Sequence, residues 1–175
     1  MRILAICGSL RARSSNLAAL QAARRLAPAG MDIVVFDGLA GLPYFNPDID
    51  TDTPPVSVKA LREAVGAANG LLVCSPEYAR GVAGVMKNAL DWLVSSSEFP
   101  DKPVAVINAS QRATDADAAL RLTLTTMSAR LVEDASITLP LLGRNLDAEG
   151  IVADPDLSAQ LRGALETFAA AIGHG

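Results

Sequence analysis

The chain has 175 residues, of which 50% are apolar and only 4% aromatic, enough for one folded domain with an aliphatic core. Its formal net charge of -4 argues against nucleic acid or an anionic membrane as a partner, because both require an excess of Lys and Arg on one face. No apolar run approaches the roughly 18 residues of a membrane span, and the apolar stretch after Arg2 is too short for a signal peptide. These features predict a cytoplasmic, single-domain protein over residues 1–175.

Short, continuous apolar runs alternate with helical patterns along the chain. Such runs are typical of strands that are buried on both faces. In chain order we expect a strand at 3–7, a helix at 16–26, a strand at 33–36, a helix at 57–68, a strand at 71–74, a helix at 85–94, a strand at 104–107, a helix at 115–131, a weaker strand at 136–139 and a helix at 156–172. This alternation predicts an α/β fold, a doubly wound five-stranded parallel sheet with helices on both faces.

Ligands of such sheets bind outside the carboxyl ends of the strands, at the point where the strand order reverses. The loops after residues 7, 74 and 107 are therefore expected to determine function. The long irregular segment 38–55 carries Asp48, Asp50 and Asp52, but it lacks the glycine and glutamate of a calcium loop. We interpret this segment as a solvated connection.

Cysteine and histidine usage limits the possible chemistry. Cys7 and Cys74 each end a predicted strand, so their thiols lie close together if the strands are neighbours. Buried cysteines usually act as small apolar fillers, and we favour that reading over a reactive pair. His174 is the only histidine, which argues against a His-based triad or a multi-His metal site, and no metal site is predicted.

The first loop, over residues 8–16, combines hydroxyl and cationic side chains at the start of a helix. Free backbone N–H groups, hydroxyls and arginine are suited to binding phosphate. Neither a Walker loop nor a dinucleotide fingerprint is present, so a mononucleotide fits better. The alternative is simple helix capping by Ser14, Ser15 or Asn16, which would explain one of these residues but not Ser9 and Arg11 as well.

The second loop, over residues 75–84, precedes the third helix. Pro76 directs the chain away from the sheet, and Gly81 and Gly84 allow sharp turns or close backbone approach. Backbone amides here would meet the polar edge of a flat heterocycle, with the ring of Tyr78 beside it. The alternative is a glycine-rich connection with an exposed tyrosine.

The two loops together are highly specific. They read Gly8-Ser9-Leu10-Arg11-Ala12-Arg13-Ser14-Ser15-Asn16 and Pro76-Glu77-Tyr78-Ala79, and the next helix contains Lys87-Asn88-Ala89-Leu90-Asp91-Trp92. These motifs closely resemble the NADPH-dependent FMN reductase family of flavodoxin-like proteins, and the likeness extends in looser form over most of the chain.

The resemblance implies a flavodoxin-like sheet order of 2-1-3-4-5 and a bound FMN. The expected cofactor-binding residues are Ser9, Arg11, Ser14, Ser15 and Asn16 around the phosphate, Pro76, Glu77 and Tyr78 along the ring and ribityl chain, and in addition Leu10, Ala79 and Ser110. The chain departs from the family pattern at Ala79, where relatives have Asn, and at Ala83, where they have Pro.

The third loop departs further from the family pattern. Relatives commonly have paired glycines where this chain has Gln111 and Arg112, although Ser110 matches the family's serine. Either this loop lies further from the flavin, or Arg112 takes part in the site. Arg11, Arg13, Arg80 and Arg112 all fall at the predicted ligand edge, which favours docking of an anionic nicotinamide cofactor over ordinary surface placement.

By this resemblance we expect an FMN-dependent NAD(P)H oxidoreductase. Hydride would pass from NADPH or NADH to FMN and then to a quinone, flavin, azo compound or metal ion. Because the cofactor carries the chemistry, no catalytic side chain is assigned. Two alternatives stay open, namely a flavodoxin-type electron carrier and a degenerate relative that binds no flavin.

The third helix also suggests an oligomer. Its apolar residues spread around too much of its circumference for one sheet-facing stripe, which predicts a contact with another subunit through this helix, and the family resemblance implies a homodimer or homotetramer. These residues are Val85, Met86, Ala89, Leu90, Trp92, Leu93 and Val94. The alternative is that segment 38–55 covers the helix.

Overall fold

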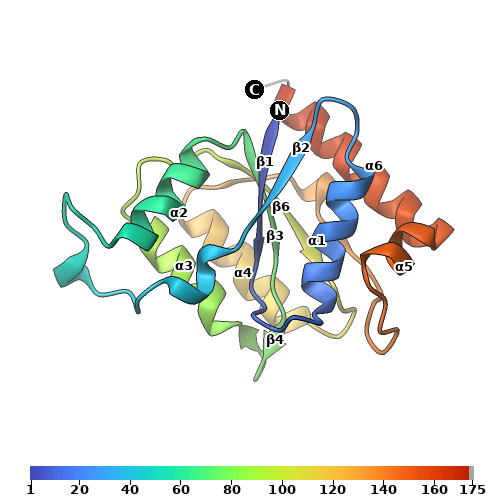
Figure 1. The fold of residues 1–175 in the computed structure, drawn as a ribbon, viewed down its shortest axis with the longest axis horizontal. Helices are drawn as coiled ribbons and strands as arrows, with labels where there is room; N and C mark the ends of the chain where they lie inside the picture. Colours follow the sequence, from blue (N-terminus) through green and yellow to red (C-terminus); the bar gives the residue numbers. More distant parts are fainter. Residues whose placement is uncertain (174–175) are drawn as a thin grey trace.

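The computed structural model describes residues 1–173, which are arranged around a parallel sheet with helices on both faces (Figure 1). His174 lies outside the described residues. The strands of the sheet are β1 (Arg2–Cys7), β2 (Asp32–Phe36), β3 (Gly70–Cys74), β6 (Pro103–Asn108), β7 (Arg130–Leu131) and β8 (Ile137–Thr138). Their order is β2-β1-β3-β6-β7, and β8 also pairs with β6. The predicted order 2-1-3-4-5 is therefore confirmed, with the fifth strand divided into two pieces.

A side-chain hydroxyl bridges the interruption between β7 and β8. The 3₁₀ turn η3 (Glu133–Ala135) separates these two pieces, so part of β6 faces no strand. Ser136 Oγ accepts a hydrogen bond from the backbone N of Val106 at 3.0 Å and donates one to the carbonyl of Val132 at 2.9 Å. The hydroxyl thus replaces a missing hydrogen bond of the ladder. Because this role requires a polar residue, the apolar run at 136–139 was the weakest strand pattern in the sequence.

The helices divide into two layers. They are α1 (Ser15–Leu26), α2 (Val56–Gly66), α3 (Gly84–Leu93), α4 (Thr114–Thr126), α5 (Ala148–Ala153) and α6 (Pro155–Gly173). Helices α1, α5 and α6 cover one face, and α2, α3 and α4 cover the other (Figure 1). Alternate residues of β1 enter the two cores, Ile3 and Ala5 on the first face and Leu4 and Ile6 on the second. Within residues 1–173, every helix is too short or too polar to cross a membrane.

Helix α4 ends earlier than its apolar periodicity predicts. The sequence suggests a helix at 115–131, but the helix stops at Thr126 and residues 130–131 form β7. Ser128 adopts a left-handed conformation with φ 64°, and Ala129 N donates to Leu124 O at 3.0 Å. This is a Schellman-type end, and it frees the following residues to pair with β6.

Segment 38–55 packs on helix α3, as expected from the alternative to an interface through this helix. This segment contains the 3₁₀ turns η1 (Gly38–Gly41) and η2 (Pro47–Ile49). Asn88 Oδ1 accepts from Phe45 N at 2.8 Å, while Asn88 Nδ2 and Trp92 Nε1 both donate to Pro43 O. The apolar side chains of α3 from Met86 to Leu93 are consequently buried within this chain. Their spread around the helix is explained without a second subunit.

Ser128→Gly is expected to stabilise the protein by about 0.5–1 kcal/mol, because glycine adopts the left-handed conformation without the steric cost of a Cβ atom. Urea unfolding measures the change. Ser128→Ala keeps the Cβ atom and should bring no gain. Equal stability of the two variants would contradict the strain at this helix end.

Protonation of Asp50 at low pH should weaken the attachment of segment 38–55 and lower the free energy of unfolding. The hydroxyl of Ser95, and then the guanidinium of Arg62 at 2.9 Å, lower the pKa of Asp50. A lowered folded-state pKa stabilises the protein above the unfolded pKa, and this stabilisation is lost as the pH falls through the folded value. Asp50→Asn should therefore cost about 1 kcal/mol at pH 7 and progressively less as the pH falls from about 5 to 3. Urea unfolding of the wild type and of Asp50→Asn at each pH measures this difference. If the difference in unfolding free energy stays constant over this range, the carboxylate does not have this role.

Candidate functional site

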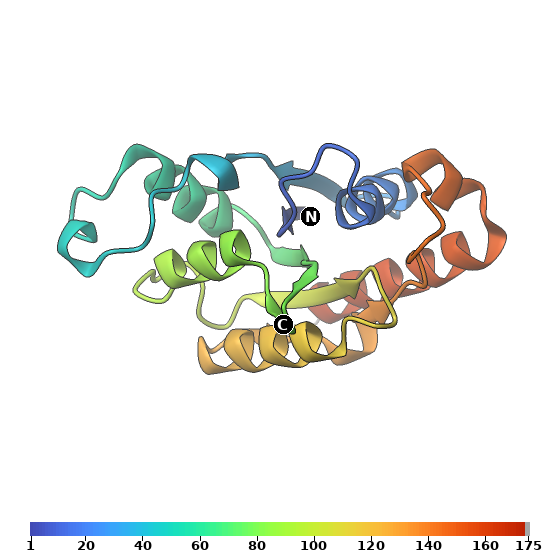
Figure 2. The same cartoon turned by 90° about the horizontal axis from the view of Figure 1, so that it is seen from below.

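A cleft of about 530 Å³ opens at the carboxyl ends of β1, β3 and β6. This is the edge predicted from the strand order, and Figure 2 looks onto it. The cleft is lined by Arg11, Ser15, Asn16, Ser75, Pro76, Glu77, Asn108, Ala109, Ser110, Arg112, Ala113, Leu142, Gly143 and Asn145. Its volume lies in the range of small-molecule sites.

The loop after β1 leaves hydrogen-bond donors free at the start of α1. Ser14 is the N-cap, and its Oγ accepts from Leu17 N at 3.4 Å, as the capping alternative predicted. Ser9 is also buried, and its Oγ accepts from Arg11 N at 3.4 Å, so both hydroxyls shape the loop. The backbone N–H groups of Ser15 and Asn16 begin the helix and have no acceptor within it. Ser15 and Asn16 both line the cleft, which makes these amides available to an anion.

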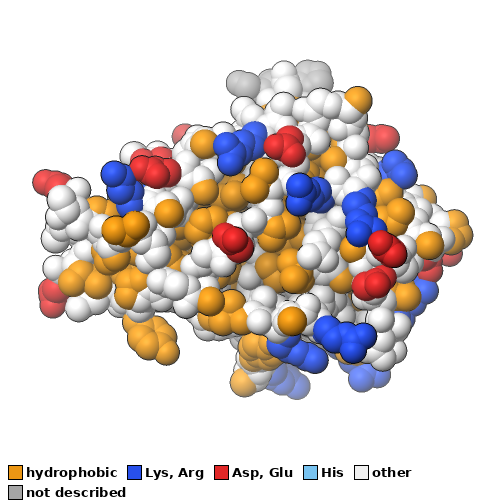
Figure 3. Space-filling view, in the orientation of Figure 1, with side chains coloured by type: hydrophobic (Ala, Val, Ile, Leu, Met, Phe, Trp, Pro, Cys, Tyr) orange, Lys and Arg blue, Asp and Glu red, His pale blue; other side chains and the backbone are white. Residues whose placement is uncertain are grey.

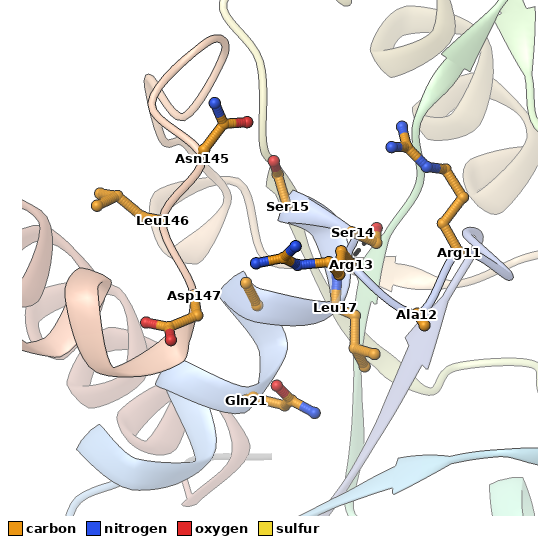
Figure 4. Close-up of a pocket in the computed structure, with 11 residues that line it drawn as sticks. Arg11, Ala12, Arg13, Ser14, Ser15, Leu17, Gln21, Asn145, Leu146 and Asp147 are labelled. Atoms are coloured by element: carbon orange, nitrogen blue, oxygen red, sulfur yellow. Dashed lines mark hydrogen bonds between the residues drawn. The ribbon is translucent and has the colours of Figure 1, made fainter.

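Two loops carry arginines to the cleft without ion-pair partners among the described residues. Arg11 and Arg112 line it, and Arg112 belongs to the third loop, which therefore reaches the site. Arg13 lines an adjoining cavity of about 560 Å³, where it extends toward the segment of Asn145 and Asp147 (Figure 4). Arg80 was expected among the arginines that would meet an anionic cofactor, but its guanidinium pairs with Asp115 at 3.3 Å and it does not line the cleft. Figure 3 shows basic side chains gathered along this lower edge of the molecule.

The loop after β3 forms a small hairpin that the sequence did not predict. Strands β4 (Glu77–Tyr78) and β5 (Gly81–Val82) pair antiparallel, and Ala79 and Arg80 form the tip with φ values of 50° and 60°. Positive φ at both central residues is the geometry of a type I′ turn, which favours Asn and Gly. Ala79 is thus a turn residue that does not line the cleft, and Tyr78, which follows the cleft residue Glu77, is also outside the lining and has 53% of its surface exposed.

Glu77 links the hairpin to helix α4. Its Oε2 accepts from the backbone N of Ala116 at 3.0 Å, in the first turn of a helix whose N-cap residue, Ala113, makes no side-chain cap. The carboxylate therefore caps α4 from a distant strand and is favourably placed at the positive end of the helix. Glu77 also lines the cleft, so one side chain fixes the hairpin, the helix and the cleft wall relative to one another.

Several cleft residues were missed by sequence reasoning. Asn108 ends β6. Its Nδ2 donates to Ala113 O at 3.1 Å, and its Oδ1 accepts from Ser110 N at 3.0 Å, so this side chain holds the third loop in its fold. A polar residue at the end of a buried strand was the available signal. Leu142, Gly143 and Asn145 come from the segment after β8 and carry no recognisable motif. Of the predicted residues, Ser9, Leu10, Ser14, Tyr78 and Ala79 do not line the cleft.

The two thiols lie beneath this site. Cys7 and Cys74 are register partners on β1 and β3, and both are buried. Burial raises the pKa of each thiol, and for Cys74 the rise is large. The sulfurs are consequently protonated and unreactive at neutral pH, which agrees with the expectation that neither is a nucleophile.

Comparison with known proteins places this architecture in a family. Residues 1–141 match the profile of the NADPH-dependent FMN reductases. An NAD(P)H-dependent FMN reductase of Pseudomonas aeruginosa is 44% identical over 112 residues, which are 63% of this chain and 60% of that protein. A 2-hydroxy-1,4-benzoquinone reductase of a Burkholderia species is 31% identical over 97% of this chain and 95% of its own length.

A solved structure agrees with these relatives over nearly the whole chain. FerB, a flavoenzyme NAD(P)H:(acceptor) oxidoreductase from Paracoccus denitrificans, superposes with a TM-score of 0.87 at 26% identity, covering 99% of this chain and 97% of FerB. The flavodoxin-like fold expected from the sequence is therefore confirmed.

Ala79→Asn is expected to stabilise the protein by about 0.5–1 kcal/mol, since Asn tolerates positive φ better than Ala. Ala79→Val provides the opposite control, because a β-branched residue is strained in this conformation. Urea unfolding of the three proteins should give the order Asn, Ala, Val. The reverse order would contradict the type I′ assignment.

Proposed function

The chain belongs to the NADPH-dependent FMN reductase family, and we propose that it is an FMN-dependent oxidoreductase that takes hydride from NADPH or NADH and passes it to a quinone or another small electron acceptor. The observation that carries this proposal is the convergence at the cleft of the first backbone amides of α1, the Asn16 side chain and Arg11, which has no ion-pair partner within residues 1–173. These groups are the donor set that a phosphate monoester requires.

The phosphate end of FMN fits the loop after β1. Gly8 allows this loop to lie against the loop after β3, since a Cβ atom on Gly8 would stand 2.5 Å from Ser75 Oγ. Ser15 and Asn16 supply backbone amides, and Arg11 supplies a guanidinium that matches phosphate oxygens in bidentate geometry. The chain as a whole is acidic and would repel a phosphate dianion, but the arginines at this edge, which lack ion-pair partners in the described part of the chain, compensate that repulsion.

The ring end of FMN fits the wall formed by the other loops. Pro76, Ala109, Ala113 and Leu142 give this part of the cleft an apolar surface, and Asn108 and Ser110 add polar groups. A flat heterocycle with polar edges needs such a mixture of apolar contact and a few hydrogen bonds. Tyr78 and Leu142, both about half exposed, stand where a planar acceptor or the nicotinamide would approach.

The side chains at the cleft bind and orient, and none is assigned as acid, base or nucleophile. Glu77 is engaged with the first turn of α4, and the thiols below are buried. When bound, FMN supplies the hydride-accepting and hydride-donating ring. The protein positions donor and acceptor in turn over this ring, and Arg112 is available to an anionic part of either.

We infer that the protein is an oligomer located in the cytoplasm. A homodimer or homotetramer is still expected, but its support now lies in Tyr44 and Val94, which are 91% and 64% exposed beside α3. A contiguous exposed apolar surface often marks a contact with another chain, and we infer that these two side chains belong to such a surface. A cytoplasmic location agrees with two reduced, buried thiols.

Reconstitution tests the proposal. Purified protein should take up FMN, show the visible spectrum of a bound flavin, be bleached by NADPH or NADH without oxygen, and regain colour when a benzoquinone is added. Bleaching by nicotinamide distinguishes the enzyme from an electron carrier. Colourless protein that ignores added FMN would refute the proposal.

Arg11→Ala should weaken FMN binding about 10- to 100-fold, because a charged hydrogen bond to the phosphate is lost. Binding of riboflavin, which has no phosphate, should change by less than about 2-fold. Arg24→Ala, at the opposite end of α1, is the matched control and should leave both affinities unchanged. An equal loss for the two flavins would contradict a phosphate contact.

A further inference from the structure

Cys74 is buried directly behind residues that line the cleft. It is the last residue of β3, is fully buried, and lies between the strands that end in the other two loops. Its Sγ donates to Asn16 Oδ1 at 3.2 Å, and the backbone of Ala109 forms a hydrogen bond to the same sulfur. Asn16 and Ala109 both line the cleft. One buried thiol therefore contacts the first and third loops beneath the ligand position.

The thiol acts as a permanent donor. Burial, and then the neighbouring Cys7, raise the pKa of Cys74 well above its usual range, so the S–H proton is retained across the working pH range. An S–H donor requires the oxygen of the Asn16 amide, not its nitrogen. With Oδ1 bound to the thiol, the amide NH2 of Asn16 is left as a donor, and no acceptor for it is found among residues 1–173.

We propose that Cys74 is a positioning residue, which holds the Asn16 side chain so that its NH2 group is presented to the phosphate ester. This inference rests on the proposed function, because the phosphate is that of FMN. The thiol would then act as a hydrogen-bond donor that orients another side chain, which is different from filling space in the core and from redox chemistry.

Cys7 provides the contrast within the same pair of strands. It faces Cys74 in the β1–β3 register and is also buried, but its thiol donates to the carbonyl of Ser9 at 3.6 Å, and within residues 1–173 it makes no hydrogen bond to Asn16. The two positions therefore share side-chain size and strand pairing, with Cys74 the more deeply buried of the two. They differ in whether the thiol orients a side chain of the cleft.

Two substitutions separate orientation from packing. Cys74→Ala removes the donor and should weaken FMN binding about 5- to 10-fold, as expected when one hydrogen bond to a charged group is partly lost. Riboflavin affinity should change by less than about 2-fold, because that ligand lacks the phosphate. Cys74→Ser retains a donor and should restore FMN affinity to within about 2-fold of wild type. Cys7→Ala, the matched control, should leave the ratio of FMN to riboflavin affinity unchanged.

A double-mutant cycle with Asn16→Ala completes the test. If Cys74 acts through Asn16, adding Cys74→Ala to Asn16→Ala should weaken FMN binding no further. Circular dichroism and thermal melting confirm that each variant is folded. Equal losses for FMN and riboflavin, additive losses in the cycle, or no rescue by folded Cys74→Ser would overturn the inference while leaving the proposed function intact. Wild-type protein that binds neither flavin would overturn the proposed function, and the inference with it.

Discussion

The register between β1 and β3 determines the candidate site. Pairing of Cys7 with Cys74 brings the two strands to the same level at their carboxyl ends, and Gly8 N continues the ladder by donating to Cys74 O at 2.8 Å. The two loops that follow must then diverge from one point, with no room for a side chain at residue 8. A shift of one residue would move the start of α1 away from the loop after β3 and bury the wrong side chains. The cleft therefore depends on strand pairing more than on any contact within it.

Much of the fold was predictable from the sequence, and the exceptions have physical causes. Buried parallel strands gave continuous apolar runs, and the cleft opens at the edge of the sheet that the expected strand order indicates. Periodicity extended α4 too far, because Met127 and Leu131 continue the apolar stripe although Ser128 reverses the chain between them. The hairpin at 77–82 escaped notice because its turn residues are Ala and Arg instead of Asn and Gly.

Residues of the cleft could be predicted from the sequence where the neighbouring residues form a recognisable chemical pattern, and not where only the tertiary fold brings them there. The loop of Arg11, Ser15 and Asn16 carried its own signal, since hydroxyl, amide and cationic groups at a helix start are informative without any fold. Segment 142–145 reaches the cleft only because β8 returns the chain to the same edge, and this is a consequence of tertiary structure. Glu77 was expected to border the cofactor, but its bond to the first turn of α4 was invisible because residues 77 and 116 are distant in the chain.

Two of the departures from the expected family pattern, at Ala79 and at Arg112, have different consequences. Ala79 sits at the tip of a strained turn and outside the cleft, so the replacement of Asn concerns backbone conformation more than flavin contact. Arg112 lies in the cleft wall, where relatives commonly have glycine, and therefore adds charge and bulk directly at the site. Asn108 makes this possible by folding the third loop through its own amide, which fixes the backbone without paired glycines. A loop stabilised in this way can carry a long cation, whose charge adds to the positive potential that Arg11 gives the cleft.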